Sequence, residues 1–103
     1  MDYSLKYSDK AMRLLRAFLF ERYQYEGNLD AAYKLLADIE NHCTVLKTFP
    51  RFGRLLHDER LREIGYRKLV AGSYVVVYTL DDSAQIVHIA GVFHHRQNYK
   101  DEL

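Results

Sequence analysis

Two apolar runs, Tyr74-Val75-Val76-Val77-Tyr78-Thr79-Leu80 and Ile86-Val87-His88-Ile89-Ala90-Gly91-Val92-Phe93, decide the fold of this chain. β-Branched and aromatic residues of this kind suit a pleated, half-buried surface. The residues between the runs, Asp81-Asp82-Ser83-Ala84, favour chain reversal because short polar side chains bond their own backbone. The stretch therefore predicts a β-hairpin, and the polar segment His94-His95-Arg96-Gln97-Asn98-Tyr99 follows its second strand directly.

Upstream of the hairpin, the pattern predicts a strand, two helices and a further strand. Large apolar residues alternate with polar ones over residues 3–7, and Ser8 or Asp9 can cap the helix that follows. Apolar side chains then recur every three or four positions over residues 11–23 and again over 32–46, with Gly27 and Asn28 as stop and start signals between them. Strand composition resumes at residues 66–70, whereas residues 54–65 fit either a short helix or an ordered loop.

This order of elements, β-α-α-β-β-β, predicts an α+β fold. Consecutive strands with short connections pair antiparallel, so we expect an antiparallel sheet of three to four strands. Two helices joined by a Gly-Asn turn should lie antiparallel and cover one face of that sheet. A chain of 103 residues is enough for one modest core, and we expect a single domain over residues 1–103.

The composition argues against a membrane or secreted protein and bears on whether the chain binds nucleic acid. The chain has no apolar run near 18 residues and no secretory signal pattern, so we expect a soluble, cytoplasmic protein without a membrane partner. The net charge is only +1, which is low for a nucleic-acid-binding protein. Residues 47–68 nevertheless hold seven basic against three acidic side chains, which fits either a phosphate-binding surface or a solvated loop. The basic residues there are Lys47, Arg51, Arg54, Arg60, Arg62, Arg67 and Lys68.

Neither a metal site nor a cofactor is predicted. Cys43 is the only cysteine, and its place on a helical apolar stripe with Ile39 and Leu46 predicts a small core residue. His88 and His94 share strand parity but lie six residues apart, roughly 20 Å in an extended chain, too far to share a metal unaided.

The polar segment after the last strand carries groups suited to metal-independent RNA cleavage. That reaction needs a base for the ribose 2′-hydroxyl, an acid for the 5′-oxygen and cations for the phosphate. Histidine suits the proton roles because it titrates near neutral pH, and arginine suits phosphate. His94 and His95 would point to opposite faces of a strand that continues past Phe93, so only one could face a given cleft. The alternative is that these residues form the solvated exit of the strand.

The order of elements and three phrases resemble the RelE/ParE superfamily of toxins from bacterial type II toxin–antitoxin systems, over nearly the whole chain. The phrases are Leu46-Lys47-Thr48-Phe49-Pro50-Arg51-Phe52-Gly53, the run from Tyr66 to Tyr78, and the last strand running into residues 94–99. The resemblance implies a growth-arresting toxin neutralised by a cognate antitoxin. One branch cleaves messenger RNA on the ribosome and inhibits translation, and the other inhibits DNA gyrase without nuclease activity.

The resemblance assigns candidate roles to individual residues. We favour a ribosome-dependent mRNA endonuclease, in which His94 or His95 carries a proton and Arg96 binds the phosphate. Tyr99 would be a second proton carrier or a stacking platform for a base. Further phosphate or RNA contacts would come from Arg67, Lys68, Arg54 and Arg51. We expect these groups to converge at one end of the sheet.

One departure favours the gyrase-binding alternative. RelE-type nucleases place an arginine directly after the tyrosine that here is Tyr74, and this chain has Val75 at that position. A third alternative is a degenerate member that only binds its antitoxin.

Overall fold

A five-stranded sheet forms the centre of the protein in the computed structural model, which describes residues 2–103. The predicted hairpin consists of β4 (Tyr74–Asp81) and β5 (Ile86–His94), which pair antiparallel. Strand β3 (Arg67–Ala71) lies beside β4, and the short strands β1 (Ser4–Tyr7) and β2 (Arg54–Leu55) form the two edges. The strand order is β1-β5-β4-β3-β2, and the predicted α+β class is confirmed.

Two details of the sheet differ from the predicted three to four antiparallel strands. Strand β2 adds a fifth strand by pairing with the start of β3, and β1 runs parallel to β5. A parallel pair needs a long crossover connection, which the elements between β1 and β5 provide. Sequence reasoning missed both features because a two-residue strand has no periodicity, and because β1 and β5 are far apart along the chain.

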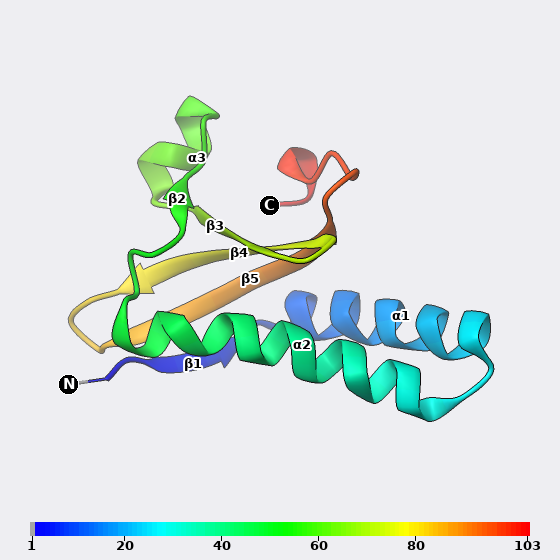
Figure 1. Cartoon of the computed structure of the whole chain (residues 1–103). Helices are drawn as coiled ribbons and strands as arrows, with labels where there is room; N and C mark the ends of the chain where they lie inside the picture. Colours follow the sequence, from blue (N-terminus) through cyan, green and yellow to red (C-terminus); the bar gives the residue numbers. More distant parts are fainter. Residues whose placement is uncertain (1) are drawn as a thin grey trace.

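The two long helices begin and end where the sequence predicts. Helix α1 (Asp9–Glu26) begins after Ser8, whose hydroxyl accepts a main-chain N–H of the first turn at 3.0 Å. Helix α2 (Leu29–Thr48) begins after Asn28, whose side-chain oxygen does the same at 3.0 Å. Gly27 between them has a φ of 73°, a left-handed conformation that glycine adopts without a steric penalty. The helices form an antiparallel hairpin beneath one face of the sheet, which we call the helix face (Figure 1). Within residues 2–103, no helix is both long and apolar enough to cross a bilayer.

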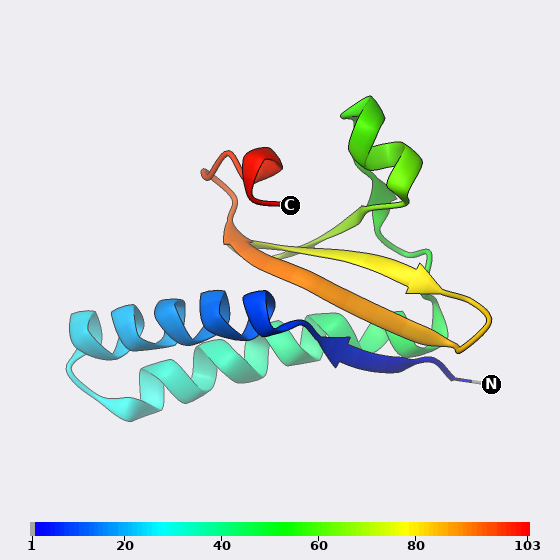
Figure 2. The ribbon, with the colours of Figure 1, turned by 180° about the vertical axis from the view of Figure 1, so that it is seen from behind.

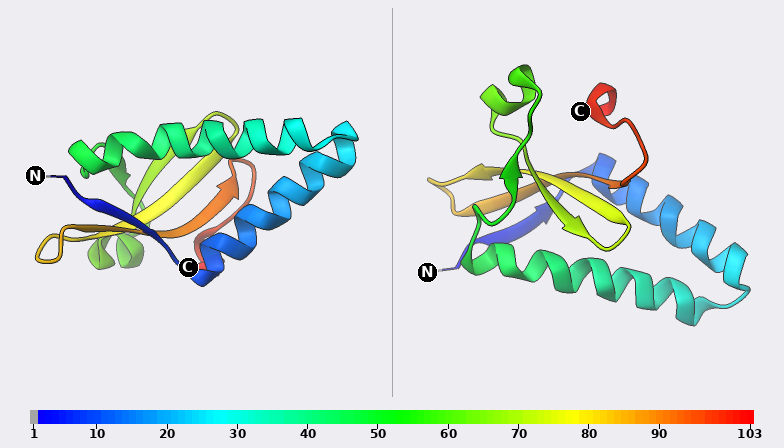
Figure 3. Two further views of the ribbon diagram at one scale, coloured as in Figure 1. Left: turned by 90° about the horizontal axis from the view of Figure 1, so that it is seen from below. Right: turned by 45° about the horizontal axis from the view of Figure 1, so that its top comes forward.

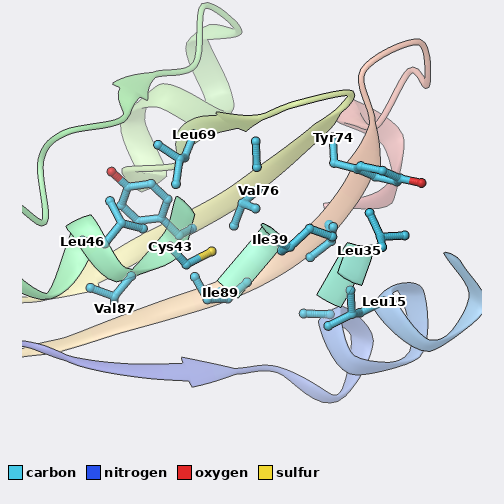
Figure 4. Close-up of a cluster of buried hydrophobic side chains, with 14 residues drawn as sticks. Leu15, Leu35, Ile39, Cys43, Leu46, Leu69, Tyr74, Val76, Val87 and Ile89 are labelled. Carbon is cyan, nitrogen blue, oxygen red and sulfur yellow. The ribbon is translucent and has the colours of Figure 1, made fainter. Parts of the chain in front are cut away.

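The main core lies between this helix pair and the sheet. Residues spaced at helical intervals on α2, including Ile39, Cys43 and Leu46, are almost completely buried. They lie against alternate residues of the central strands, such as Val76 and Ile89 (Figure 4). The prediction that Cys43 is a small core residue is therefore confirmed.

The opposite face of the sheet, which we call the far face, carries the remaining elements. Residues 54–65, left open by the sequence, form β2 and a short helix α3 (Glu59–Ile64) capped by Asp58. Both α3 and the 3₁₀ turn Lys100–Glu102 lie on the far face (Figures 1 and 2). A second apolar cluster lies beneath them, formed by the buried residues Leu56, Leu61, Val75, Val77 and Phe93. The far face is thus partly filled by apolar side chains.

Candidate functional site

The predicted proton carriers follow a shift in the register of β5. Val77 of β4 pairs with Gly91 and Tyr78 pairs with Ile89, so Ala90 is an extra residue in β5. Such a bulge changes which face the following residues occupy. Phe93 consequently lies in the far-face cluster.

Strand β5 extends to His94, so this residue takes the parity opposite to Phe93 and lies on the helix face. Its ring meets the buried ring of Tyr74 edge-on, with 5.6 Å between centroids. The Nδ1 atom of His94 accepts the main-chain N–H of Arg96 at 3.3 Å.

His95 lies outside the strand and is exposed. Its ring stacks on that of His94, with 4.6 Å between centroids. Both its main-chain N–H and its Nδ1 lie 2.9 Å from the carbonyl oxygen of Ser73, which ties it to the β3–β4 turn. The two imidazoles and the exposed side chain of Arg96 therefore form one group at the end of β5.

Tyr99 occupies a different place. Its ring stacks on Phe93, with 5.2 Å between centroids and 20° between planes, and packs against the far-face cluster. Burial raises the pKa of the Tyr99 hydroxyl above its usual value, which disfavours its loss of a proton. Tyr99 is thus part of the packing on the far face, while His94 lies on the helix face.

The same far-face cluster contains Val75, the residue that stands where the resemblance expects an arginine. Its side chain is 6% exposed and lies in the same cluster as Leu56, Leu61 and Phe93. A charged side chain has no place in such a setting without a partner. The local structure around position 75 is built for an apolar residue.

Two of the four predicted phosphate-binding cations make contacts within the protein. Arg67 donates from its guanidinium to the carbonyl oxygen of Gly53 at 2.8 Å. Arg51 forms an ion pair with Asp82, which also accepts a hydrogen bond from Tyr3 at 2.6 Å. The Tyr3 hydroxyl and the Arg51 guanidinium together hold the pKa of Asp82 below its usual value.

The other two cations are neighbours on the far face. Lys68 and Arg54 are register partners on β3 and β2, and Lys68 pairs with Val77, a member of the far-face cluster. Neither forms an ion pair with another residue in the described part of the chain. Together they form a basic pair at the edge of the sheet.

The expected convergence of Arg67 with residues 94–99 is wrong. Arg67 pairs with Tyr78 and His94 pairs with Tyr74, four residues apart along β4, or about 13 Å at 3.3 Å per residue. Arg67 also shares the parity of Tyr78 and lies on the helix face, away from Tyr99. The strand alternation that separates Arg67 from Lys68 and the bulge at Ala90 together divide the predicted site between the two faces.

A set of exposed aromatic residues lies on the helix pair, outside the predicted set of site residues. Phe20, Tyr23 and Tyr33 lie on the outer side of the helices and are 60%, 41% and 64% exposed. Their spacing differs from that of the buried residues on each helix, and this difference indicates that they face outward.

Comparison with known proteins agrees with this architecture. Residues 5–99 match the family described as the ParE toxin of the parDE type II toxin–antitoxin system. The chain belongs to this family. The predicted membership of the RelE/ParE superfamily is thereby confirmed. No curated protein sequence matches the chain.

Two solved structures show the same fold as this ParE-family chain. One is the RelBE2 toxin–antitoxin complex from Mycobacterium tuberculosis, with a TM-score of 0.68, 24% identity, and coverage of 92% of this chain and 100% of that one. The other is the chromosomal ParDE toxin–antitoxin system of P. aeruginosa, with a TM-score of 0.67, 20% identity, and coverage of 89% and 95%.

Proposed function

We propose that this toxin arrests growth by binding DNA gyrase in the cytoplasm, without cleaving RNA, and that a cognate antitoxin neutralises it. The observation that carries the proposal is the buried side chain of Val75 within the far-face cluster. The nuclease branch of the superfamily has an arginine there, and phosphoryl chemistry needs such a cation to hold charge on the phosphate. Membership of the ParE family agrees with the gyrase-binding branch.

The remaining geometry supports a binding protein. Tyr99 is stacked on Phe93, and Arg67 is bonded to the Gly53 carbonyl on the other face of the sheet. A base, an acid and a phosphate clamp must lie around one phosphodiester within hydrogen-bond reach. The groups that were expected to fill these roles are divided between two faces, so the arrangement favours recognition of a protein surface over catalysis.

One observation favours a second candidate, a ribosome-dependent mRNA endonuclease. Arg54 and Lys68 form an adjacent basic pair, and His95 and Arg96 are exposed at the end of β5. RNA bound along the far face would meet the first pair, and a ribosome could complete the active site. In this candidate the ribosome and mRNA replace gyrase as partners.

The antitoxin proposal rests on the structural relatives. Both similar structures come from toxin–antitoxin systems, and one is a toxin–antitoxin complex. We therefore expect the product of a small reading frame beside the toxin gene to bind this chain and to restore growth when co-expressed.

One pair of assays separates the two candidates. Purified toxin is added to DNA gyrase and relaxed plasmid, and in parallel a translated message is mapped by primer extension after toxin expression. We expect inhibited supercoiling and intact message. Ribosome-dependent cuts that disappear in Arg54→Ala/Lys68→Ala or His95→Ala variants, together with normal supercoiling, would overturn the gyrase proposal in favour of the nuclease.

A further inference from the structure

A loop at the β2 side of the sheet exposes two phenylalanine rings. The loop, residues 49–53, connects the end of α2 to the edge strand β2 (Figure 3). Phe49 and Phe52 are 62% and 61% exposed, and both border a hollow of about 420 Å³. Because the two rings share one hollow, they form a contiguous apolar patch, and such a patch marks an interaction site.

Hydrogen bonds from the sheet hold this loop in place. The Tyr78 hydroxyl accepts the main-chain N–H of Gly53 and donates to the carbonyl oxygen of Pro50, both at 2.8 Å. The Arg67 guanidinium donates to the carbonyl oxygens of Gly53 at 2.8 Å and Arg51 at 3.4 Å. The loop that carries the two phenylalanines is therefore fixed in the free protein, so a partner loses little affinity to ordering it.

A second hollow extends the patch onto β3. It has a volume of about 190 Å³, and Phe52 borders it together with Arg54, Lys68 and Val70. Val70 is 58% exposed, and it shares the far face with Lys68 because the two residues are two positions apart on one strand. We call the surface formed by Phe49, Phe52, Arg54, Lys68 and Val70 the edge surface.

Strand β3 has an open edge within this surface. Strand β2 pairs only with Arg67 and Lys68, so the rest of β3 has no strand on that side within residues 2–103. Alternate residues of a strand turn their main-chain groups to opposite sides, and the Tyr66 carbonyl accepts the N–H of Leu56 on the β2 side. The N–H and C=O of Val70, four residues after Tyr66, therefore point to the open edge, where an added strand can bond them.

The charges of the edge surface select an acidic partner. Arg54 and Lys68 are register partners, and neither forms an ion pair with another residue in the described part of the chain. Arg51, in the neighbouring loop, is instead paired with Asp82. Like charges that lie opposite each other on adjacent strands repel, so a carboxylate placed between Arg54 and Lys68 relieves this repulsion and pairs with both.

We propose that the edge surface binds an acidic, extended segment of DNA gyrase. The inference rests on the proposed binding of gyrase and assigns it a surface. The segment adds a strand beside Val70, its carboxylates pair with Arg54 and Lys68, and an apolar side chain fills the hollow between the two phenylalanines. A single strand of RNA also suits exposed rings beside cations. It leaves the open edge of β3 unpaired, however, so the observations favour a peptide.

The first test removes one of the aromatic rings. Phe52→Ser is introduced into the whole toxin, and the Kd for purified DNA gyrase and the inhibition of supercoiling are measured. Phe20→Ser is the matched control, since Phe20 is 60% exposed but lies on α1. We expect Phe52→Ser to raise the Kd and the half-inhibitory concentration by at least about 10-fold, because aromatic anchors dominate interfaces, and the control to change them less than about 3-fold.

The second test reverses the two charges. Arg54→Glu/Lys68→Glu keeps two like charges opposite each other, so the repulsion between β2 and β3 is preserved while an acidic partner is repelled. Arg13→Glu/Arg16→Glu changes the net charge equally at two exposed positions of α1 and controls for the field of the whole protein. We expect the Kd for gyrase to rise by at least about 100-fold in the first variant and by less than about 3-fold in the control.

Hydrogen exchange supplies a readout that needs no substitution. Gyrase should slow the exchange of the Val70 main-chain N–H, which points to the open edge, and leave the amides of α1 unchanged. Circular dichroism of each variant establishes that it is folded before its Kd is interpreted.

Three results would overturn the inference. Edge variants that bind and inhibit gyrase like the wild type would place the contact elsewhere. Edge variants that keep gyrase inhibition but lose RNA cleavage, antitoxin binding or self-association would assign the edge surface to another partner. A wild-type toxin that does not bind gyrase would overturn the proposed function as well, and this result is distinct because it is obtained before any substitution is made.

Discussion

The hydroxyl group of Tyr78 connects the central strand β4 to the loop between α2 and β2. It accepts the main-chain N–H of Gly53 at 2.8 Å and donates to the carbonyl oxygen of Pro50 at 2.8 Å. A Cβ atom on Gly53 would lie 2.6 Å from this hydroxyl and 2.5 Å from the Lys68 carbonyl, so no larger residue fits. The packing of Tyr78 against this loop thus explains why the segment around Pro50 contains a glycine at position 53.

Tyr78→Phe is therefore expected to lower the free energy of unfolding by about 1–3 kcal/mol, because the buried Gly53 N–H loses its acceptor. Urea unfolding measures the change, with Tyr25→Phe as a control that should stay within about 0.5 kcal/mol. Equal stability of the two variants would contradict the account of this hydroxyl.

At the scale of the element, the C-terminal segment packs on the sheet through a stack of rings. Gly91 leaves room for Phe93, since a Cβ atom there would lie 2.5 Å from the Phe93 ring. Tyr99 stacks on this ring, and Leu103 packs against the same cluster. Tyr99, which the sequence predicts to take part in catalysis, therefore packs on apolar residues of the far face.

Substitution of Tyr99 separates packing from proton transfer. We expect Tyr99→Ala to lower the free energy of unfolding by about 2 kcal/mol through loss of the aromatic pair and buried area, and Tyr99→Phe to retain both stability and toxicity. Asn98→Ala, at an exposed neighbouring position, is the control. Full stability with lost toxicity in Tyr99→Phe would show instead that the hydroxyl acts in a reaction.

At the scale of the whole molecule, the sequence predicts features that depend on neighbouring residues. It predicts less well on which face of the sheet a strand residue lies. The caps at Ser8 and Asn28 and the buried stripe of α2 follow from short-range geometry, and the structure confirms them. The separation of Arg67 from Tyr99 depends on the bulge at Ala90 and on pairing between distant strands, which no local pattern encodes. The candidate site was therefore predicted as a set of residue types but not as an arrangement.

The core as a whole also determines how stability depends on pH. Burial raises the pKa of the Cys43 thiol from 9.0 to about 11, and burial likewise raises the pKa of Tyr7 and of Tyr78 above 10.0. A group whose pKa is raised in the folded state keeps its proton there while the unfolded chain loses it. Its contribution to stability is complete below the unfolded pKa and is lost as pH rises toward the folded value.

The free energy of unfolding should accordingly stay level between about pH 7 and 8.5 and fall above about pH 9, and the Cys43 thiol alone can account for about 3 kcal/mol of that fall, at 1.36 kcal/mol per pKa unit. Urea unfolding at a series of pH values measures the slope. A Tyr7→Phe/Cys43→Ala variant lacks two of the three groups, so its stability should decline less steeply, whereas Tyr25→Phe should follow the wild type. Parallel declines in all three proteins would mean that these buried groups do not control alkaline unfolding.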